Sequence, residues 1–395
     1  MELVHTLNGH TGRIFSLAIC CMPDGRRWAA SASHDRTVRI WCINTNQHLR
    51  TIEYTDFVWR VFVVKIPQPV VVAFISAEGK IQVSDLETGE TLSTFYGRLI
   101  FSGNTAIFPQ PIIITAEGEE DVCFIDILTG DKLKTIRGGF DKMFRAVVTT
   151  GPDPLLVFTT WNTQTRRSTI QTYELLEDTD DPYFSVDNSD DEDGTLIKSP
   201  GSPGGRSDSS SITTHSSKEK MTLMFEGDSR DGVTSLVITQ GSKPKICSGH
   251  YDFMVRLWSI ESKTLLMVLE GHLDYVGAVA CWKGNLPVVV SGSSDGTIRA
   301  WNTETGELLA TGDGHTRDAW ALGVTNEPNA RIVSGSFDRT VKVWDLRPVL
   351  MNLNWQRRKD FCMFLSMLGF CHSYVQGENG AVVGKGCFIS QEEVA

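Results

Sequence analysis

Three groups of residues in this sequence combine a histidine, a serine and an aspartate, the side chains of a hydrolytic triad. The groups are His10, Ser31 and Asp35; His272, Ser291 and Asp295; and His315, Ser334 and Asp338. In a triad the histidine activates the serine hydroxyl for attack on an acyl group, and the aspartate orients the histidine. A catalytic group would occur once, whereas this combination occurs three times. We therefore interpret the groups as structural and predict no catalytic residue and no enzymatic activity.

The same serines and aspartates belong to a longer repeat. The segments SASHDRTVRIW (31–41), SGHYDFMVRLW (248–258), SGSSDGTIRAW (291–301) and SGSFDRTVKVW (334–344) each place Asp four residues and Trp ten residues after the first Ser. The tryptophans of the last three segments lie 43 residues apart. A Gly-His pair precedes three segments, and Gly227-Asp228 replaces it in the fourth. These residues resemble the WD-repeat (β-transducin-like) family, in which each repeat forms a four-stranded propeller blade.

The resemblance implies that the tryptophan indole, serine hydroxyl, histidine imidazole and turn aspartate form a chain of hydrogen bonds. A satisfied buried network of this kind fixes the packing of two strands and a loop. The residues expected to form these networks are His10, Ser31, Asp35, Trp41, Ser248, Asp252, Trp258, His272, Ser291, Asp295, Trp301, His315, Ser334, Asp338 and Trp344. The unit of Ser248 has no histidine before it, so its network is expected to be incomplete.

Three weaker copies lie between the first strong unit and the second. They span residues 66–95, 108–136 and 151–176, with Ser84, Ile125 and Tyr173 at the tryptophan positions. Their β-branched runs and turn residues predict strands joined by hairpins. Without residues 176–220, the repeat region 3–348 has the length of seven units of 43 residues. We therefore predict an all-β fold, a seven-bladed β-propeller of four-stranded antiparallel blades.

In the WD-repeat family each repeat begins with the outer strand of the preceding blade. Residues 3–7 are therefore expected to pair with the strand at 340–345 and close the ring, which removes a free sheet edge. The predicted boundaries are 1–175 for blades one to four, 176–220 for an insert, 221–348 for blades five to seven and 349–395 for a C-terminal helix and tail. Blades two to four lack the network residues, so apolar packing alone should hold this softer part of the ring.

The net charge of the 395-residue chain is −11, and most of it lies in residues 176–220. This segment is acidic at first and then rich in Ser, Gly and Pro, so we expect it to be disordered. The rest of the chain is almost neutral, which disfavours nucleic acid and anionic membranes as partners. Ser189 resembles an acidophilic kinase site, and Ser199 and Ser202 precede prolines as proline-directed sites do. These three serines are phosphorylation candidates.

Cysteine usage and motif content predict the compartment and the cofactors. Nine cysteines without a C-x-x-C pair, and no N-x-Ser/Thr acceptor, favour the cytoplasm, the nucleus or both. No apolar run is long enough to cross a bilayer, and the first residues lack the features of a signal peptide. No phosphate-binding glycine loop or zinc motif occurs. We therefore expect no cofactor and no metal.

The resemblance also implies a partner-binding face around the central channel. By this resemblance, face residues come from the start of each innermost strand and from the position before the turn aspartate. These positions hold Phe15, Trp59, Arg60, Phe144, Arg145, Trp320, His34, Tyr251 and Phe337, with Phe101 as the equivalent in the third repeat. Aromatic residues and arginine dominate binding energies, and the arginines favour an acidic or phosphorylated segment. The alternative is that the aromatic side chains pack between blades.

The residues after the last repeat add a helix and an alternative function. Residues 353–370 place apolar side chains at helical spacing opposite a basic run at 357–359, which predicts an amphipathic helix packed on the propeller or docked on another protein. Asp338, Trp344, Asp345 and Arg347 resemble the WDxR box of substrate receptors that dock onto the propeller adaptor of cullin-RING ubiquitin ligases. We predict a non-catalytic scaffold that binds protein or peptide partners, with such a receptor as the alternative.

Overall fold

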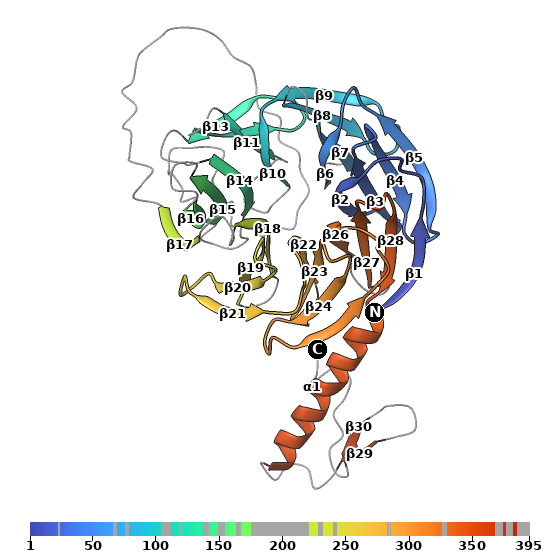
Figure 1. The fold of residues 1–395 in the computed structure, drawn as a ribbon, viewed down its shortest axis with the longest axis vertical. Helices are drawn as coiled ribbons and strands as arrows, with labels where there is room; N and C mark the ends of the chain where they lie inside the picture. The colour runs from blue at the N-terminus through green and yellow to red at the C-terminus, as the bar shows by residue number, and fades with distance from the viewer. Residues whose placement is uncertain are drawn as a thin grey trace, which may run out of the picture.

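Seven four-stranded antiparallel sheets form a ring in the described part of the chain (Figure 1). The computed structural model describes residues 1–22, 24–65, 69–75, 79–103, 112–117, 121–136, 142–148, 155–162, 167–174, 221–227, 232–239, 243–282, 284, 286–325, 330–367, 374–376 and 382–384. Only the backbone is described for residues 65, 74, 98–103, 116–117, 136, 142–145, 161–162, 167, 174, 221–227, 358–367, 374–376 and 382–384. The ring confirms the predicted seven-bladed β-propeller.

Each blade is a meander of four strands, which are named below from the innermost strand outward. Blade one consists of β2 (Ile14–Cys21), β3 (Arg27–Ser33), β4 (Thr37–Cys42) and β5 (Gln47–Glu53), and blade two of β6 (Val58–Lys65), β7 (Pro69–Ile75), β8 (Lys80–Asp85) and β9 (Thr91–Tyr96). Blade three consists of β10 (Arg98–Gly103), β11 (Ile112–Glu117), β12 (Asp121–Asp126) and β13 (Lys132–Ile136), and blade four of β14 (Lys142–Val148), β15 (Leu155–Asn162), β16 (Arg167–Glu174) and β17 (Met221–Gly227). Blade five consists of β18 (Val233–Ile238), β19 (Lys245–His250), β20 (Val255–Ser259) and β21 (Leu265–Leu269), and blade six of β22 (Val276–Cys281), β23 (Val288–Ser293), β24 (Ile298–Asn302) and β25 (Leu308–Gly312). Blade seven consists of β26 (Ala319–Val324), β27 (Arg331–Ser336), β28 (Val341–Asp345) and, as its outer strand, β1 (Glu2–Leu7).

The first strand of the chain closes the ring, as predicted. Strand β1 pairs antiparallel with β28, so that Leu7 lies opposite Val341. The Lys342 ammonium also donates to the Thr6 hydroxyl at 3.0 Å, between residues at opposite ends of the propeller sequence. Blade four takes its outer strand β17 from beyond residues 176–220, so the insertion point falls between the third and fourth strands of that blade.

The middle strands of the blades are buried because a neighbouring blade packs against each face. Every residue of β3, β23 and β28 is buried, and these strands consist mainly of Val, Ala and Ser. Small and β-branched side chains suit such close packing of sheets. The largest side chains buried in the cores are three of the repeat tryptophans, Trp41, Trp301 and Trp344.

A shift of register recurs in the innermost strand of all seven blades. In blade one it lies between Ile14 and Ser16, and the other six blades repeat it at the same place. A bulge of this kind leaves one residue unpaired and re-aims its side chain. The unpaired residues are Phe15, Trp59, Ile100, Phe144, Thr234, Gly277 and Trp320. The third repeat therefore presents Ile100 at this position, which corrects the predicted Phe101.

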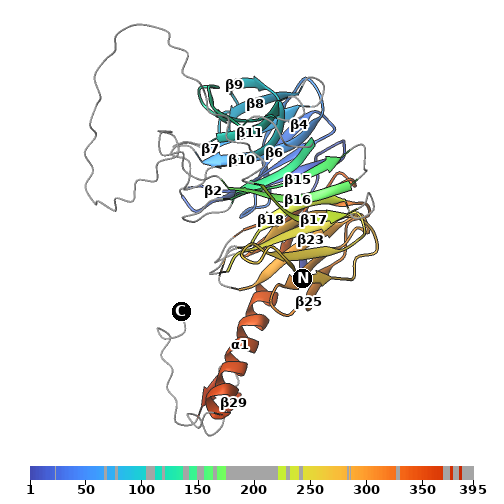
Figure 2. The same cartoon turned by 90° about the vertical axis from the view of Figure 1, so that its left-hand side faces the viewer.

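One helix, α1 (Arg347–Met367), follows the last blade. Its first turns pack on the propeller, where Val349, Leu350 and Leu353 are buried against the core around Trp282. Beyond them the helix extends away from the ring in both views (Figures 1 and 2). The predicted helix therefore exists but begins at Arg347, and its last turns extend beyond the propeller.

Candidate functional site

The predicted hydrogen-bond network is complete in blades one, six and seven. In blade one the Trp41 indole donates to the Ser31 hydroxyl at 2.8 Å, and this hydroxyl lies 2.7 Å from Nε2 of His10. Nδ1 of His10 donates to Asp35 at 2.8 Å. The corresponding contacts in blades six and seven join His272, Ser291, Asp295 and Trp301, and His315, Ser334, Asp338 and Trp344. The network connects two strands of a blade to the loop that enters it.

The connectivity Asp–His–Ser is that of a hydrolytic triad, but its surroundings are those of a structural core. Because Asp35 accepts from Nδ1 of His10, Nε2 is the acceptor for the Ser31 hydroxyl. That hydroxyl is buried and already accepts the Trp41 indole N–H. The serines of blades six and seven are buried in the same way. No acyl substrate can approach an oxygen in this position, so the groups hold the fold together.

The aspartates of these networks are charged acceptors at neutral pH. Burial raises the pKa of Asp35, but the hydrogen bonds from His10 and Thr37 outweigh burial and hold the pKa well below its usual range. The backbone N–H of Thr11 contributes a further hydrogen bond. The same balance lowers the pKa of the equivalent aspartates in blades six and seven. Hydrogen bonds to the ionised carboxylate thus link stability to pH.

Blade five builds its network from a different histidine, which the sequence prediction missed. His250, at the end of β19, is buried and places Nε2 at 2.7 Å from the Ser248 hydroxyl, which also accepts the Trp258 indole N–H at 2.8 Å. Asp252 does not join this chain and instead pairs with Arg256. The expected loss of histidine is therefore corrected: a strand residue takes the place of the loop residue.

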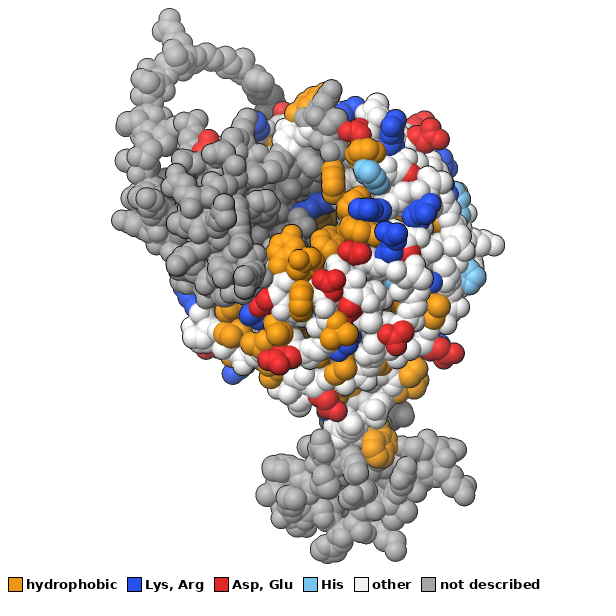
Figure 3. Space-filling view, in the orientation of Figure 1, with side chains coloured by type: hydrophobic (Ala, Val, Ile, Leu, Met, Phe, Trp, Pro, Cys, Tyr) orange, Lys and Arg blue, Asp and Glu red, His pale blue; other side chains and the backbone are white. Residues whose placement is uncertain are grey.

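Aromatic residues from several blades meet around a central cavity of about 640 Å³. Among the residues whose side chains are described, those of six innermost strands line it: β2, β6, β14, β18, β22 and β26. Six of the predicted face residues line it too, namely Phe15, Trp59, Arg60, Tyr251, Trp320 and Phe337. We call the aromatic residues among them, together with Tyr275, the aromatic rim. Figure 3 shows hydrophobic side chains around the centre of the ring and a group of Lys and Arg side chains beside them.

Four residues of the aromatic rim, Phe15, Trp59, Trp320 and Phe337, form a connected cluster across blades two, one and seven. The Phe15 ring lies 4.4 Å from Trp59 and 5.0 Å from Phe337 between ring centroids, and Phe337 stacks on Trp320 at 5.5 Å. Phe15, Trp320 and Phe337 are half-buried, whereas Trp59 is 40% exposed. Both predicted roles of the aromatic residues therefore occur in one cluster. The rings pack against one another between blades, and Trp59 remains exposed to a partner.

Comparison with protein families identifies the repeats. Three segments, residues 1–42, 263–302 and 306–345, match the family model of the WD domain, G-beta repeat. The chain is a WD40-repeat propeller. No curated protein matches the chain. The matched segments are the first, sixth and seventh repeats, the three with complete Trp–Ser–His–Asp networks, and the WD40 propeller in general implies a non-catalytic scaffold for protein interactions.

The bulges explain how the WD40 blades present the rim. Phe15, Trp59 and Trp320 each occupy the unpaired position of their innermost strand. In blade six the same position is Gly277, where a Cβ would lie 2.6 Å from the Trp320 ring. In blade five it is Thr234, which is buried and donates its hydroxyl to the Val276 carbonyl. A small residue in blade six therefore makes room for the large one in blade seven.

Three residues in or beside the central cavity were missed in the sequence prediction. Tyr275 lies 5.2 Å from Tyr251 between ring centroids, and Phe57 lies 3.6 Å from the exposed His34. Asp318 lines the cavity and accepts a hydrogen bond from the Ser294 hydroxyl at 2.9 Å. Phe57, Tyr275 and Asp318 all stand directly before the first residue of an innermost strand. This shared repeat position is the signal that could have found them.

Some predicted site residues lie outside what is described. The backbone of β14 includes Phe144 and Arg145, but their side chains are not among the described ones. Ser189, Ser199 and Ser202 lie in the segment outside the described residues. Within the described residues, no group of three or more His, Cys, Asp or Glu side chains could hold a metal ion. No helix among the described residues has the length and apolarity needed to cross a bilayer.

The residues of the predicted ligase-docking box separate into two places. Asp338 and Trp344 belong to the blade seven network. Asp345 and Arg347 follow Trp344 at the C-terminal end of β28, where the Arg347 guanidinium donates to both carboxylate oxygens of Asp345 and Arg331 pairs with the same carboxylate at 2.7 Å. Hydrogen bonds from Arg347 lower the pKa of Asp345 to about 2, although burial opposes this. The Arg347 side chain stays 42% exposed at the start of α1.

Proposed function

We propose that this WD40 propeller is a non-catalytic scaffold that binds a protein or peptide segment on the aromatic rim. The observation that supports it is the aromatic rim around the central cavity, in which Trp59, Tyr251 and Tyr275 keep about two fifths of their surface exposed. Exposed aromatic anchors beside a cavity are typical hot spots of interfaces. The cytoplasm or nucleus, as the cysteine usage predicts, is part of this proposal.

Arg60 and Asp318 give the cavity both signs of charge. The Asp318 carboxylate accepts the Ser294 hydroxyl, and Arg60 stands directly after the bulge residue Trp59. We propose that Arg60 and Arg145 favour partner segments that carry carboxylates or phosphates. Replacement of both by alanine should weaken capture of an acidic segment more than capture of a neutral one, and equal loss of both would contradict this preference.

A random peptide display library selected on the wild-type chain tests the rim. Trp59→Ala with Trp320→Ala removes two anchors and should abolish enrichment of the wild-type binders, because anchor aromatic residues supply about 2 kcal/mol or more each. Tyr96→Ala is the matched control, because Tyr96 is an exposed aromatic residue on the outer strand β9. Equal enrichment on the wild type and the double variant would contradict the proposal.

The alternative function, a substrate receptor of a cullin-RING ligase, uses the end of β28 opposite the turn of Asp338. The observation that favours it is the exposed Arg347 guanidinium, which Asp345 holds in one orientation. Purified ligase adaptor should bind the wild-type chain, and Arg347→Ala should abolish binding. Trp59→Ala with Trp320→Ala should leave it intact. Failure of the wild-type chain to bind the adaptor would overturn this alternative and leave the scaffold proposal untouched.

A further inference from the structure

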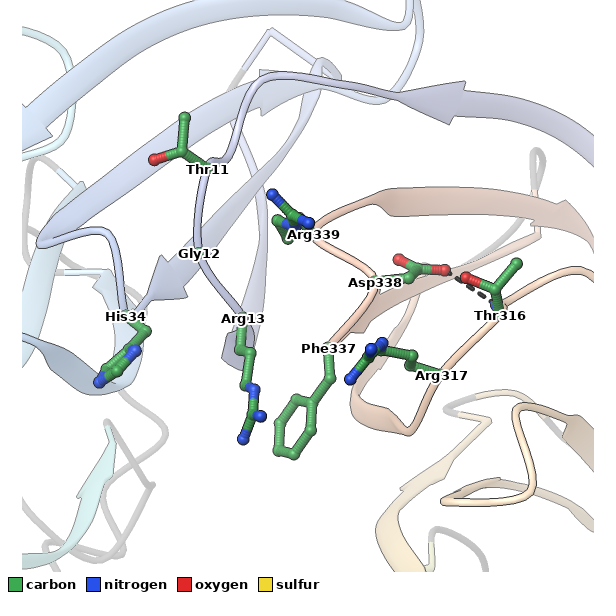
Figure 4. Close-up of a pocket in the computed structure, with 9 residues that line it drawn as sticks. All are labelled: Thr11, Gly12, Arg13, His34, Thr316, Arg317, Phe337, Asp338 and Arg339. Atoms are coloured by element: carbon green, nitrogen blue, oxygen red, sulfur yellow. Dashed lines mark hydrogen bonds between the residues drawn. The ribbon is translucent and has the colours of Figure 1, made fainter.

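Three arginines surround a second cavity, of about 370 Å³, between blades one and seven. Arg13 stands directly before β2, Arg317 stands in the loop before β26, and Arg339 stands in the turn between β27 and β28. Figure 4 shows the three side chains around one opening, with Phe337 between Arg13 and Arg317. We call this cavity the arginine pocket. It exists only because closure of the ring brings the first and last repeats together.

The charge of the arginine pocket is not neutralised by the protein. Among the described residues, no carboxylate lies within ion-pair distance of Arg13, Arg317 or Arg339. Asp338 is the one acidic residue among the described residues of the lining, but its side chain is 7% exposed. Its oxygens accept hydrogen bonds from His315, the Thr316 backbone and the Thr340 hydroxyl. Three cations against one engaged carboxylate leave the pocket positive, so it favours an anion.

The arginine pocket is continuous with the aromatic rim. Phe337 lines both cavities, and its ring stacks on Trp320 on one side. The Arg13 guanidinium lies 5.2 Å from the centroid of the same ring. This cation–π contact positions Arg13 at the border between the two cavities. A segment bound at the rim therefore has an anion site beside it.

The turn that carries Arg339 is one that glycine would fill without strain. Arg339 adopts φ 73°, a left-handed conformation that is unfavourable for residues with a side chain. The equivalent position of blade six is Gly296, with φ 80°, and glycine takes this conformation without strain. Glycine would therefore suit the turn of Arg339 better.

We propose that the arginine pocket binds the phosphate of a phosphoserine or phosphothreonine in the segment held by the aromatic rim. This inference rests on the proposed function and specifies its ligand. A phosphate monoester offers three strong acceptor oxygens and close to two charges, which matches several guanidinium groups, whereas a carboxylate offers two oxygens and one charge. A nucleic acid backbone would need a row of such sites. The pocket accommodates one isolated phosphate.

The test uses immobilised libraries of synthetic peptides that have phosphoserine at the centre and random residues around it, with matched libraries that have serine or glutamate there. The full chain is first treated with phosphatase, so that its own serines do not compete. Wild type should retain the phosphoserine library about tenfold more strongly than either matched library. Arg339→Gly should abolish this preference without lowering the unfolding midpoint in urea, because glycine suits the turn.

The matched control is Arg36→Gly. Arg36 occupies the same turn position of blade one at φ 68° but does not line the pocket, so this variant should keep the full preference. Arg317→Gln provides a second pocket variant that does not change the backbone, and it should lower the preference as well. Equal loss in Arg36→Gly and Arg339→Gly would show a general effect of surface charge and overturn the assignment of the pocket.

The remaining outcomes separate the pocket from the rim. Equal retention of the glutamate and phosphoserine libraries would replace phosphate by carboxylate as the ligand and overturn the proposal. Retention of all three libraries without preference, lost in Trp59→Ala with Trp320→Ala, would overturn the pocket but leave the rim as a peptide site. If wild type retains none of the libraries, both the pocket and the proposed function are wrong.

Discussion

The Ser248 hydroxyl in blade five accepts the Trp258 indole N–H, and its second partner is Nε2 of His250 at 2.7 Å. Both Ser248 and His250 are fully buried. His250→Ala leaves a cavity and a buried hydroxyl with one contact fewer, so it should lower the free energy of unfolding by about 2–4 kcal/mol. Urea unfolding followed by tryptophan fluorescence measures this loss. His5→Ala, at an exposed position of β1, is the control, and an equal effect of both substitutions would refute the role of His250.

The carboxylates of the complete networks make the free energy of unfolding depend on pH. The pKa of Asp295 is lower in the folded chain than in the unfolded one, since hydrogen bonds from His272 outweigh burial. Its contribution is therefore fully present above the ordinary aspartate pKa near 4 and is lost as the pH falls toward the folded value. Asp295→Asn should lower the free energy of unfolding by about 1.5–3 kcal/mol at pH 7 and reduce its fall between about pH 5 and pH 2.

Urea titrations at a series of pH values test the acid dependence. Asp313→Asn is the control, because Asp313 is exposed and lies outside the networks. If wild type and Asp295→Asn lose stability in parallel as the pH falls, then the carboxylate does not link this network to pH.

Particular residues show how far the sequence determines the site. The aromatic residues at the bulges were predictable, because Phe15, Trp59 and Trp320 occupy one repeat position whose geometry every blade copies. His250 was not predictable from the loop pattern, because it reaches the serine from within the strand. The arginine pocket was not predictable either, since its members hold different repeat positions and meet only through ring closure.

At the scale of elements, β1 holds the ring closed through one buried side chain and a ladder of pairs. Leu7 is 4% exposed and packs in the core with Ile14, Trp41 and Val341. Leu7→Ala should lower the free energy of unfolding by about 2–5 kcal/mol, because it leaves a cavity where blades seven and one meet. It should also raise light scattering, because a loosened β1 exposes β28 as a free edge.

A control from the same strand separates the core from the surface. Val4 is 41% exposed, so Val4→Ala should change the free energy of unfolding by no more than about 0.5 kcal/mol. Urea unfolding with light scattering compares the two variants. If Leu7→Ala behaved like Val4→Ala, the strand would be an accessory to the ring and not its closure.

Helix α1 shows why an element can be predicted while its placement is not. Apolar residues at helical spacing predicted the helix, but its start depends on the end of β28, where the Asp345 carboxylate accepts the Arg347 backbone N–H at 2.9 Å and caps the first turn. Among the helix residues whose side chains are described, Val349, Leu350 and Leu353 enter a core. Periodicity reports which side chains share a face, and the tertiary surroundings decide whether anything covers that face.

Across the whole molecule, the ring joins two kinds of blade. Blades one, five, six and seven have a buried Trp–Ser–His group, whereas blades two, three and four place the buried Ser84, Ile125 and Tyr173 at the tryptophan position. The arginine pocket lies between blades one and seven, both of the first kind. A binding site that spans two blades benefits from this, because the blades that form it are held by networks as well as by apolar packing.

Native-state hydrogen exchange with rising urea tests this division. The backbone N–H groups of β7 and β11 should become exchangeable at lower urea than those of β23 and β27, with an opening free energy lower by about 2 kcal/mol or more, since each missing network removes hydrogen bonds worth about 1 kcal/mol each. Mass spectrometry of peptides from these four strands measures both groups in one sample. His250→Ala should move β19 toward the faster group and leave β27 in the slower one. Exchange of all strands at one common opening free energy would show instead that the closed ring unfolds as a single unit, in which the networks of one side stabilise the blades of the other.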